Sequence, residues 1–403
     1  MKPEFRIGTH YFHEEPNMNY TFNRVYSVNG GDLVEIREAS KRIKTLEDWS
    51  REFIGLAEKA RSEGRLLNAA AYYRGANFYL HPDDPRKTMT YETYLSLIHD
   101  IYREDFETGM IKELKVPFAG GFLPVWHAGP AAAGERRNVV VMHLGNDSIK
   151  EELVPLVHFF REAGLELFLF EGPGQGEALY RYGIHMIPEW EKPVKAVLDH
   201  FNLDDITLIG LSLGGYLAPR AAAFEPRVSR VIAWGVMYDF FDVVVSRRGK
   251  FLEMLLKSLL AIRASVLVNG IIRLKMKKDT YTRWGLEHGM FLMDAKDPYG
   301  YFKKIIRFSM KKISHLVSQD FLLIGSTHDH FIPAGHFGLQ ISKLVNTRSL
   351  TGRIFTRSEH AENHVSFGNT TLVLRYIISW IREHTALMEN DDKADPEFFH
   401  QAG

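Results

Sequence analysis

The sequence of 403 residues predicts an α/β fold, in which a mostly parallel β-sheet carries helices on both faces. Two patterns lead to this prediction. From Val116 onward, short β-branched apolar runs alternate with amphipathic stretches, as strands alternate with helices around a parallel sheet. The runs are almost continuously apolar, which is typical of strands that are buried on both faces.

The hydrophobic patterns also place the individual strands and helices. Apolar runs of strand length are expected to form strands at Val139–His143, Leu165–Phe170, Ile206–Leu211, Val228–Ala233, Phe321–Ile324 and near Gly352–Thr356. Amphipathic stretches are expected to form helices at Glu151–Ala163, Glu189–Phe201 and Gly335–Leu344. The chain is longer than a typical single domain, so the sheet is expected to carry additional regions.

Residues 1–115 are predicted to form a helical N-terminal region. Over Leu33–Arg103, apolar residues recur at three- and four-residue spacing, which indicates amphipathic helices. Thr45 and Asp48 have side chains that can cap the start of one helix, and Gly64 is a residue at which that helix can end. No second copy of this pattern recurs at a fixed period, so a helical repeat is not expected.

A second helical region interrupts the predicted sheet. The strand-helix alternation stops between Val236 and Lys312, and residues 236–316 are predicted to form a cap over the carboxyl ends of the strands. From Arg247 to Lys312 there are sixteen Lys or Arg residues against five Asp or Glu. These cations either form a solvated helical face or attract anionic or phenolate substrates. The remaining ranges are the core, 116–235 and 317–386, and a C-terminal tail, 387–403.

The composition narrows the choice of ligands and partners. Fifty basic and fifty acidic residues cancel, so the overall charge does not favour nucleic acid or an anionic membrane as a partner. The chain has no cysteine, which excludes disulfides, thiolate chemistry and cysteine-ligated metal centres. We therefore expect a small-molecule substrate, with no cofactor and no nucleic acid.

Two segments bear on where the protein is found. The N-terminal sequence MKPEFRIGTHYFHEEP carries charges where a signal peptide needs an apolar stretch. In the apolar segment Phe251–Lys278, the charged residues Glu253, Lys257 and Arg263 leave no run of about 18 residues that could span a bilayer. We expect a cytoplasmic protein without a membrane partner.

The sequence GLSLG, from Gly210 to Gly214, predicts a nucleophile at Ser212. It follows an apolar strand and precedes a stretch that favours a helix, which is the context of the G-x-S-x-G turn. In such a turn the serine has strained backbone angles and its hydroxyl points away from the sheet. The flanking glycines allow the strand and the helix to approach each other closely.

A serine hydroxyl is a weak nucleophile and needs a base that an acid orients. In this architecture the acid and then the base follow the serine along the chain. Asp329 comes directly after an apolar strand in FLLIGSTHDHFIP, which makes it the candidate acid. His364 in SEHAENHVSFGN lies nearest the last helix and is the candidate base, with His360 as the alternative.

Two other motifs allow different interpretations. His328 and His330 flank the candidate acid and could be metal ligands, but no further ligand stands at a suitable spacing. The turn EGPGQG is rich in glycine, but Gly172, Gly174 and Gly176 match neither G-x-G-x-x-G nor a P-loop. We expect no metal site and no phosphate site, and we expect EGPGQG to shape the active site from beside the oxyanion loop.

Acyl transfer also requires donors for the developing oxyanion. The backbone N–H of Leu213, directly after the nucleophile, is the first candidate. The second is the N–H of Gly145, because the segment VVVMHLGNDS follows an early strand. His143 is expected to stabilise this loop, and both His143 and Leu144 are expected to lie near the substrate.

The motifs HLGNDS, EGPGQGEA, GLSLGGYLAPRAA, GSTHDHFIP and AENHVSFGN together resemble one branch of the alpha/beta hydrolases. The branch includes 2,6-dihydroxypseudooxynicotine hydrolase and fungal hydrolases that shorten heptaketides. The resemblance extends over nearly the whole chain. It implies an alpha/beta-hydrolase fold with a triad of Ser212, Asp329 and His364. It also implies hydrolysis of a carbon–carbon bond beside a ketone, a retro-Claisen reaction.

The sequence departs from this branch in two loops. Leu144 replaces the first glycine of an oxyanion loop that usually reads His-Gly-Gly, and His364–Ser366 reads His-Val-Ser in place of His-Cys-Gln. The branch also has an acidic residue early in the cap, a position that Asp239 or Asp242 fills unless they cap helices.

Several functions fit these observations. A retro-Claisen hydrolase, a carboxylesterase or lactonase, and an acyltransferase would all use the same triad, because they differ in the leaving group and the acceptor. A fold without catalytic activity that binds a protein partner is the alternative from another class. Tyr72 and Tyr73, if exposed, would suit such a partner or a homodimer contact, and otherwise they belong to the helical core.

Overall fold

The computed structural model describes residues 5–28, 30–131, 138–245 and 249–391, with side chains up to residue 386. Its centre is an eight-stranded sheet with the strand order β1-β2-β4-β3-β5-β6-β7-β8. The strands β3 to β8 are parallel, and β1 and β2 form an antiparallel edge. The strands are β1 (Lys112–Phe118), β2 (Gly121–Ala128), β3 (Asn138–His143), β4 (Leu165–Phe170), β5 (Ile206–Leu211), β6 (Val228–Trp234), β7 (Asp320–Ser326) and β8 (Ser349–Phe355).

The five predicted inner strands are confirmed within three residues at each end, whereas the edge strands differ from expectation. The sixth predicted strand, near Gly352–Thr356, begins three residues earlier, at Ser349. The strands β1 and β2 were not predicted. Most β1 side chains are exposed or half-buried, and its sequence KELKVPF lacks the long apolar run that marks an inner strand.

Residues that alternate along each strand pack into two separate cores. In β5, for example, Leu208 belongs to the core on one face and Ile209 to the core on the other. The helices α7 (Val154–Glu162) and α17 (Thr370–Asp391) contribute to the same core as Ile209. The other face is covered by α9 (Glu191–Phe201), α10 (Gly214–Ala222) and α16 (Gly335–Lys343). Helices therefore cover both faces, as the sequence predicts.

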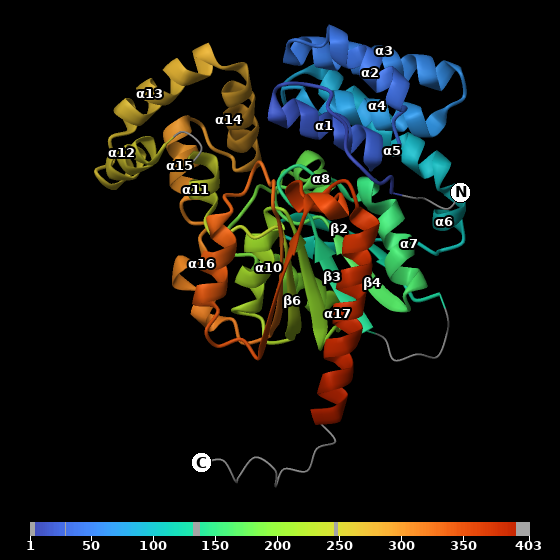
Figure 1. Ribbon diagram of the computed structural model, residues 1–403, viewed down its shortest axis with the longest axis vertical. Coiled ribbons are helices and arrows are strands. Elements are labelled where there is room, and N and C mark those ends of the chain that lie inside the picture. Colours follow the sequence, from blue (N-terminus) through green and yellow to red (C-terminus); the bar gives the residue numbers. More distant parts are fainter. Residues whose placement is uncertain (1–4, 29, 132–137, 246–248, 392–403) are drawn as a thin grey trace.

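In the residues described before β1, six helices precede the sheet, and Figure 1 shows α1 to α5 packed together above it. Thr45 and Asp48 form the predicted capping box of α3, and Gly64 follows the end of this helix with φ of +73°. The first helix lies upstream of the predicted range. The helices are α1 (Pro16–Ser27), α2 (Leu33–Arg42), α3 (Leu46–Ser62), α4 (Leu66–Tyr79), α5 (Pro85–Ile101) and α6 (Arg103–Glu107).

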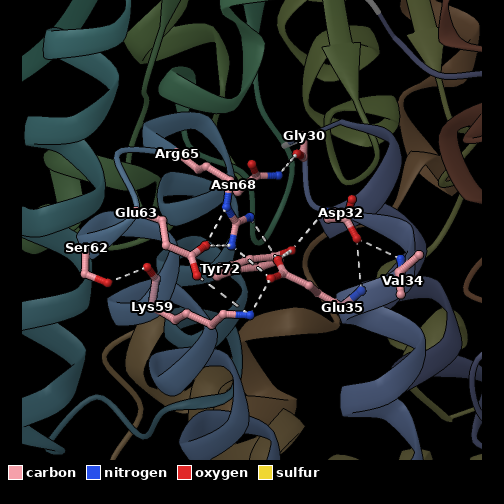
Figure 2. Close-up of polar contacts among 10 residues, drawn as sticks. All are labelled: Gly30, Asp32, Val34, Glu35, Lys59, Ser62, Glu63, Arg65, Asn68 and Tyr72. Carbon is pink, nitrogen blue, oxygen red and sulfur yellow. Dashed lines mark hydrogen bonds and ion pairs between the residues drawn. The ribbon is translucent and has the colours of Figure 1, made fainter.

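A polar network connects α2, α3 and α4 (Figure 2). The carboxylate of Glu35 accepts hydrogen bonds from Arg65, from Lys59 and from the hydroxyl of Tyr72. Partial burial raises the pKa of Glu35, but these three hydrogen bonds outweigh burial and hold the pKa below its ordinary value. Tyr72 and Tyr73 are both buried, so they belong to the helical core and do not offer an exposed surface.

Between β6 and β7, the described residues 235–245 and 249–319 form five further helices, and Figure 1 shows them beside the N-terminal helices at the same end of the sheet. They are α11 (Phe240–Val245), α12 (Lys250–Ala261), α13 (Ser265–Lys278), α14 (Thr280–Leu292) and α15 (Pro298–Ile305). No helix in the described ranges is long and apolar enough to cross a membrane. The last helix, α17, continues to Asp391, past the predicted start of the tail at 387, and residues 392–403 lie outside the described part.

Candidate active site

Ser212 occupies a sharp turn between β5 and α10. Its φ of +61° lies in the left-handed region, which is a strained conformation for a serine. The backbone N–H of Ser212 donates to the carbonyl of Trp234 at 2.8 Å, which holds the turn against β6. A Cβ atom at Gly210 would collide with the carbonyl of Gly214, so this close approach of strand and helix requires glycine.

A chain of two hydrogen bonds connects the predicted nucleophile, base and acid. Ser212 Oγ lies 2.8 Å from His364 Nε2, and His364 Nδ1 lies 2.8 Å from Asp329 Oδ2. A carboxylate can only accept, so Nδ1–H donates to Asp329 and Nε2 is left to accept the hydroxyl proton of Ser212. This is the tautomer that a histidine base requires.

The environment of Asp329 keeps it ionised. Burial raises its pKa, but the neighbouring His364 and two backbone N–H groups outweigh burial and hold the pKa of Asp329 below the ordinary value. The N–H groups belong to Phe331 and Ile332 and donate to Oδ1 at 2.8 and 2.9 Å. One carboxylate oxygen is therefore fixed by the backbone, and the other is directed at the imidazole.

Contacts with the neighbouring strands hold the loop that carries His364. The indole N–H of Trp234 donates to the carbonyl of Val365 at 3.0 Å, and the hydroxyls of Ser326 and Ser366 are 3.0 Å apart. The alternative base, His360, is exposed, and its backbone forms the end of a short helical turn. The structure thus brings His364, and not His360, to the serine.

The histidines on either side of Asp329 point to different surroundings. His328 is exposed and its Nδ1 contacts the hydroxyl of Thr327, while the ring of His330 packs against Phe331 and Tyr20. Within the described ranges, no group of three or more His, Asp or Glu side chains is arranged to hold a metal ion.

The loop after β3 lies directly against the turn at Ser212. A Cβ atom at Gly145 would stand 2.7 Å from the Cβ of Ser212, so this approach also requires glycine. The side chain of Gln175, from the EGPGQG turn, donates to the carbonyls of Leu144 and Gly145 at 2.6 and 3.0 Å. The turn therefore lies beside the predicted oxyanion loop, as expected. Gln175 holds this loop by hydrogen bonds that the sequence pattern did not reveal.

His143 and Leu144 are fully buried beneath this loop and do not line the cavity beside Ser212. Burial lowers the pKa of His143 to about 3, so its imidazole is neutral at physiological pH. The ring packs between Phe170 and Trp190, and its Nδ1 lies 3.2 Å from the carbonyl of Leu144. This environment favours the structural role expected of His143, whereas a contact with substrate stays a prediction for both residues.

Known proteins resemble this chain in sequence. No family model matches the sequence. The hydrolase acrC of Aspergillus aculeatus is 29% identical to it over 297 residues, which is 62% of this chain and 67% of the relative. The alpha/beta hydrolase psoB of Aspergillus fumigatus is 27% identical over 325 residues, covering 69% and 71% of the two chains.

Among solved structures, 2,6-dihydroxy-pseudo-oxynicotine hydrolase has 18% identity and a TM-score of 0.62, covering 89% of this chain and 94% of its own. The strand order, the turn at Ser212 and the similar proteins all point to the same fold. This chain has the alpha/beta-hydrolase fold. The likeness to the solved structure shows the fold alone, and the roles of individual residues rest on the geometry of this chain.

A cavity of about 280 Å³ opens onto Ser212 and His364. Its walls come from three regions: the N-terminal helices, the sheet edge and the five helices between β6 and β7. Most of the wall is apolar, and it includes Phe240, Leu252, Leu256, Ile272, Phe302 and Phe331. Such a cavity suits a small, largely apolar molecule.

The N-terminal helix α1 places Tyr20 beside the base. The ring centroids of Tyr20 and His364 are 5.9 Å apart, and both side chains line the cavity. Burial raises the pKa of Tyr20 well above its ordinary value, although Arg24 opposes this shift. The phenol of Tyr20 therefore stays neutral. Tyr20 is far from the triad residues along the chain, which explains why the sequence pattern did not identify it.

A second histidine–carboxylate pair lies in the cavity and was also missed. His288 Nε2 on α14 lies 2.7 Å from Asp147 Oδ1 on the loop after β3. Burial raises the pKa of Asp147, but His288 and Arg24 outweigh burial and lower the pKa below the ordinary value. The indole of Trp284 stacks on the imidazole at an interplanar angle of 5°. Only the folded chain brings these side chains together.

The two acidic residues predicted for substrate binding in the cap are not among those that line the cavity. Asp239 accepts a hydrogen bond from the backbone of Asp242 and forms an ion pair with Lys311 at 2.7 Å. The carboxylate of Asp242 lies 2.8 Å from Nε2 of the buried His336. Asp239 therefore acts as a helix cap here, and a substrate-binding role for either residue stays a prediction without geometric support.

Proposed function

We propose that this protein is a serine hydrolase that transfers an acyl group from a small-molecule substrate to water. The observation that carries the proposal is the pair of 2.8 Å hydrogen bonds that links Ser212, His364 and Asp329. The three residues follow one another in the chain order expected for this fold. The apolar cavity beside Ser212 supports a ketone or polyketide-like substrate.

In the first half of the reaction, His364 Nε2 takes the hydroxyl proton while Ser212 Oγ attacks the substrate carbonyl. The negative oxygen of the tetrahedral intermediate accepts hydrogen bonds from the N–H groups of Leu213 and Gly145. Neither N–H has a hydrogen-bond acceptor in the described part of the chain. The bond to the leaving group then breaks, the proton on His364 passes to the leaving group either directly or through another group, and the acyl group remains on Ser212.

In the second half, His364 takes a proton from water, and the resulting hydroxide attacks the acyl-enzyme. The intermediate collapses, the acid leaves, and Ser212 regains its proton from His364. Asp329 stabilises the imidazolium that forms in each half. In the retro-Claisen version, a β-diketone and one water molecule yield a carboxylic acid and a ketone.

The retro-Claisen version needs a proton for the carbanion that leaves. His288 is the group in the cavity wall that supports this step, because its imidazole lines the cavity and its Nε2 lies 2.7 Å from Asp147 Oδ1. The proton would pass from His288 to the carbon of the leaving group as the carbon–carbon bond breaks. The proton that His364 took from Ser212 would then return to His288 through water, which leaves His364 free to act as the base in the second half. Ester or lactone hydrolysis, or acyl transfer to another acceptor, would use the same triad without this requirement.

The proposal can be tested with two substrates and three proteins. Purified wild type, Ser212→Ala and the control Ser342→Ala, an exposed serine far along the chain, are assayed with p-nitrophenyl acetate and 1-phenyl-1,3-butanedione. We expect Ser212→Ala to lose turnover of both substrates and the control to retain it. Ester turnover without diketone cleavage would identify an esterase. If Ser212→Ala changes neither rate, the chain uses another site or has no catalytic function.

A further inference from the structure

The cap presents an unusual apolar surface to solvent on α12 and α13. Figure 1 shows these two helices at the outer edge of the cap. Large apolar side chains on these helices and on the turn between them are 56% to 82% exposed, although large exposed apolar areas are uncommon on soluble proteins. The outer apolar surface, as it is called below, consists of Phe251, Met254, Ile262, Val266, Leu267 and Leu274.

Exposed cations interleave with this outer apolar surface. They are Lys250, Arg263, Arg273, Lys277 and Lys278. In the described part of the chain, none of these five is paired with a carboxylate. The acidic residue Glu253 on α12 is already engaged by Lys257. The surface therefore combines exposed apolar area with positive charge that the chain itself does not neutralise.

The combination of apolar area and positive charge favours some binding partners of this surface over others. A second copy of the chain docked symmetrically would bring like charges together, which opposes association. A bilayer with anionic headgroups satisfies both features, because apolar side chains enter the acyl boundary while lysine and arginine reach the headgroups. The pattern along α12 and α13 is that of an amphipathic segment that lies in the plane of the interface.

The opposite face of the same two helices forms part of the active-site cavity. Leu252 and Leu256 on α12 and Ile272 on α13 line this cavity. A membrane bound to the outer apolar surface would therefore lie one helix layer away from the substrate site. An apolar substrate dissolved in the bilayer would be concentrated beside the cavity, and this arrangement suits the apolar wall.

We propose that the outer apolar surface of α12 and α13 docks this protein onto an anionic membrane. The docking is peripheral and does not require any helix to span the bilayer. It departs from the expectation that the chain has no membrane partner, which was drawn from the overall charge and from the lack of a spanning segment. The overall charge of zero conceals the local excess of cations on these two helices.

Co-sedimentation with phospholipid vesicles tests the proposal. The full chain is mixed with vesicles of phosphatidylcholine alone or with about 30 mol % phosphatidylserine. One variant, Phe251→Ser with Val266→Ser, removes apolar contacts, and another, Arg273→Gln with Lys277→Gln and Lys278→Gln, removes charge. The matched controls are Ile7→Ser with Val345→Ser, and Lys192→Gln with Lys343→Gln and Arg375→Gln, which change exposed residues elsewhere.

We expect binding to the phosphatidylserine vesicles that weakens at high salt and falls by about tenfold or more in each surface variant. The two controls should bind as the wild type does. Circular dichroism and ester hydrolysis in the absence of vesicles verify that each variant is folded. The proposal is overturned if the wild type stays in the supernatant, or if the controls lose binding equally. It is also overturned if the apolar variant converts a dimer into a monomer, since a second copy would then cover the surface.

Discussion

At the scale of single residues, the proposed chemistry depends on the fixed positions of the three triad side chains. Ser212 is held by the strained turn, and His364 is oriented by a carboxylate whose other oxygen is fixed by backbone N–H groups. Each contact sets the position or the protonation state of the next group. Small changes that keep the shape but alter one proton are therefore the most informative tests.

Asp329→Asn keeps the size of the side chain but removes the charge that stabilises the imidazolium. The amide can also favour the wrong tautomer of His364, so kcat is expected to fall by a factor on the order of 10⁴. Steady-state kinetics with an ester substrate measure this loss. Asp242→Asn is the matched control, because it alters a histidine–carboxylate pair that does not line the cavity. A comparable loss in the control would mean that Asp242 takes part in the reaction after all.

His288→Ala separates the two kinds of bond cleavage. Without the imidazole, protonation of a departing carbanion is expected to slow diketone cleavage by about 10²- to 10⁴-fold. Ester hydrolysis has an easier leaving group and should change much less. The ratio of the two rates in the variant and the wild type is the measurement. Equal losses for both substrates would assign His288 a role in substrate binding or packing instead of proton transfer.

Gln175→Leu tests how the EGPGQG turn supports the oxyanion loop. The change removes the hydrogen bonds to the carbonyls of Leu144 and Gly145 while keeping a similar volume. The N–H of Gly145 should then lose its alignment, which is expected to lower kcat about 10- to 100-fold with little change in KM. A rise in KM at constant kcat would show that the turn serves substrate binding.

At the scale of elements, the N-terminal helices are tied to the catalytic core by a buried carboxylate. Glu152, in the short helix at Lys150–Leu153, accepts hydrogen bonds from Arg24 on α1 and Arg74 on α4. The same arginines reach the loop after β3, where Arg74 donates to the carbonyl of Asp147 at 2.6 Å. The helical region therefore supports the loop after β3, which carries the predicted oxyanion donor Gly145, as well as the cavity wall.

Glu152→Gln would leave two buried arginines without their anion, so the free energy of unfolding is expected to fall by about 3–5 kcal/mol. Burial raises the pKa of Glu152, but both arginines outweigh burial and lower the pKa to about 2. Since the unfolded value is about 4.3, the stabilisation is complete above that pH and is lost as the pH falls towards 2.

Urea unfolding of wild type and Glu152→Gln at several pH values checks this expectation. The difference between the two proteins should be largest near neutral pH and should shrink below about pH 4. Glu35→Gln is the control, because its partners Arg65 and Lys59 are more exposed and the expected loss is only about 1 kcal/mol. A difference that persists unchanged at about pH 2 would exclude the ionic origin.

At the scale of the whole molecule, the sequence predicted those features that depend on a short, local pattern of residues. The inner strands, the serine turn and the order of Ser212, Asp329 and His364 all have such a pattern, and the structure brings these three residues together. The residues of the cavity wall form no such local pattern in the sequence. Tyr20 and His288 come from helices far apart in the chain, and only tertiary packing brings both to the cavity.

The differences in the sheet and the cap have similar physical reasons. The strand β1 is an exposed edge, so its sequence lacks the apolar run of a buried strand. Asp239 is acidic and lies early in the cap, but its carboxylate accepts a hydrogen bond from the backbone of Asp242 and pairs with Lys311. These contacts depend on the folded chain, so the sequence could not show that the carboxylate is engaged in this way. The division into domains and a homodimer both stay predictions.

The measurement that tests the central proposal most directly is covalent labelling with a fluorophosphonate probe, followed by peptide mass spectrometry. A hydroxyl that is activated by a histidine base should react, and we expect one adduct per chain on the peptide that contains Ser212. Asp329→Asn should react far more slowly. Folded wild-type protein that stays unlabelled, or that carries its adduct on a different residue, would contradict the assignment of Ser212 as the nucleophile.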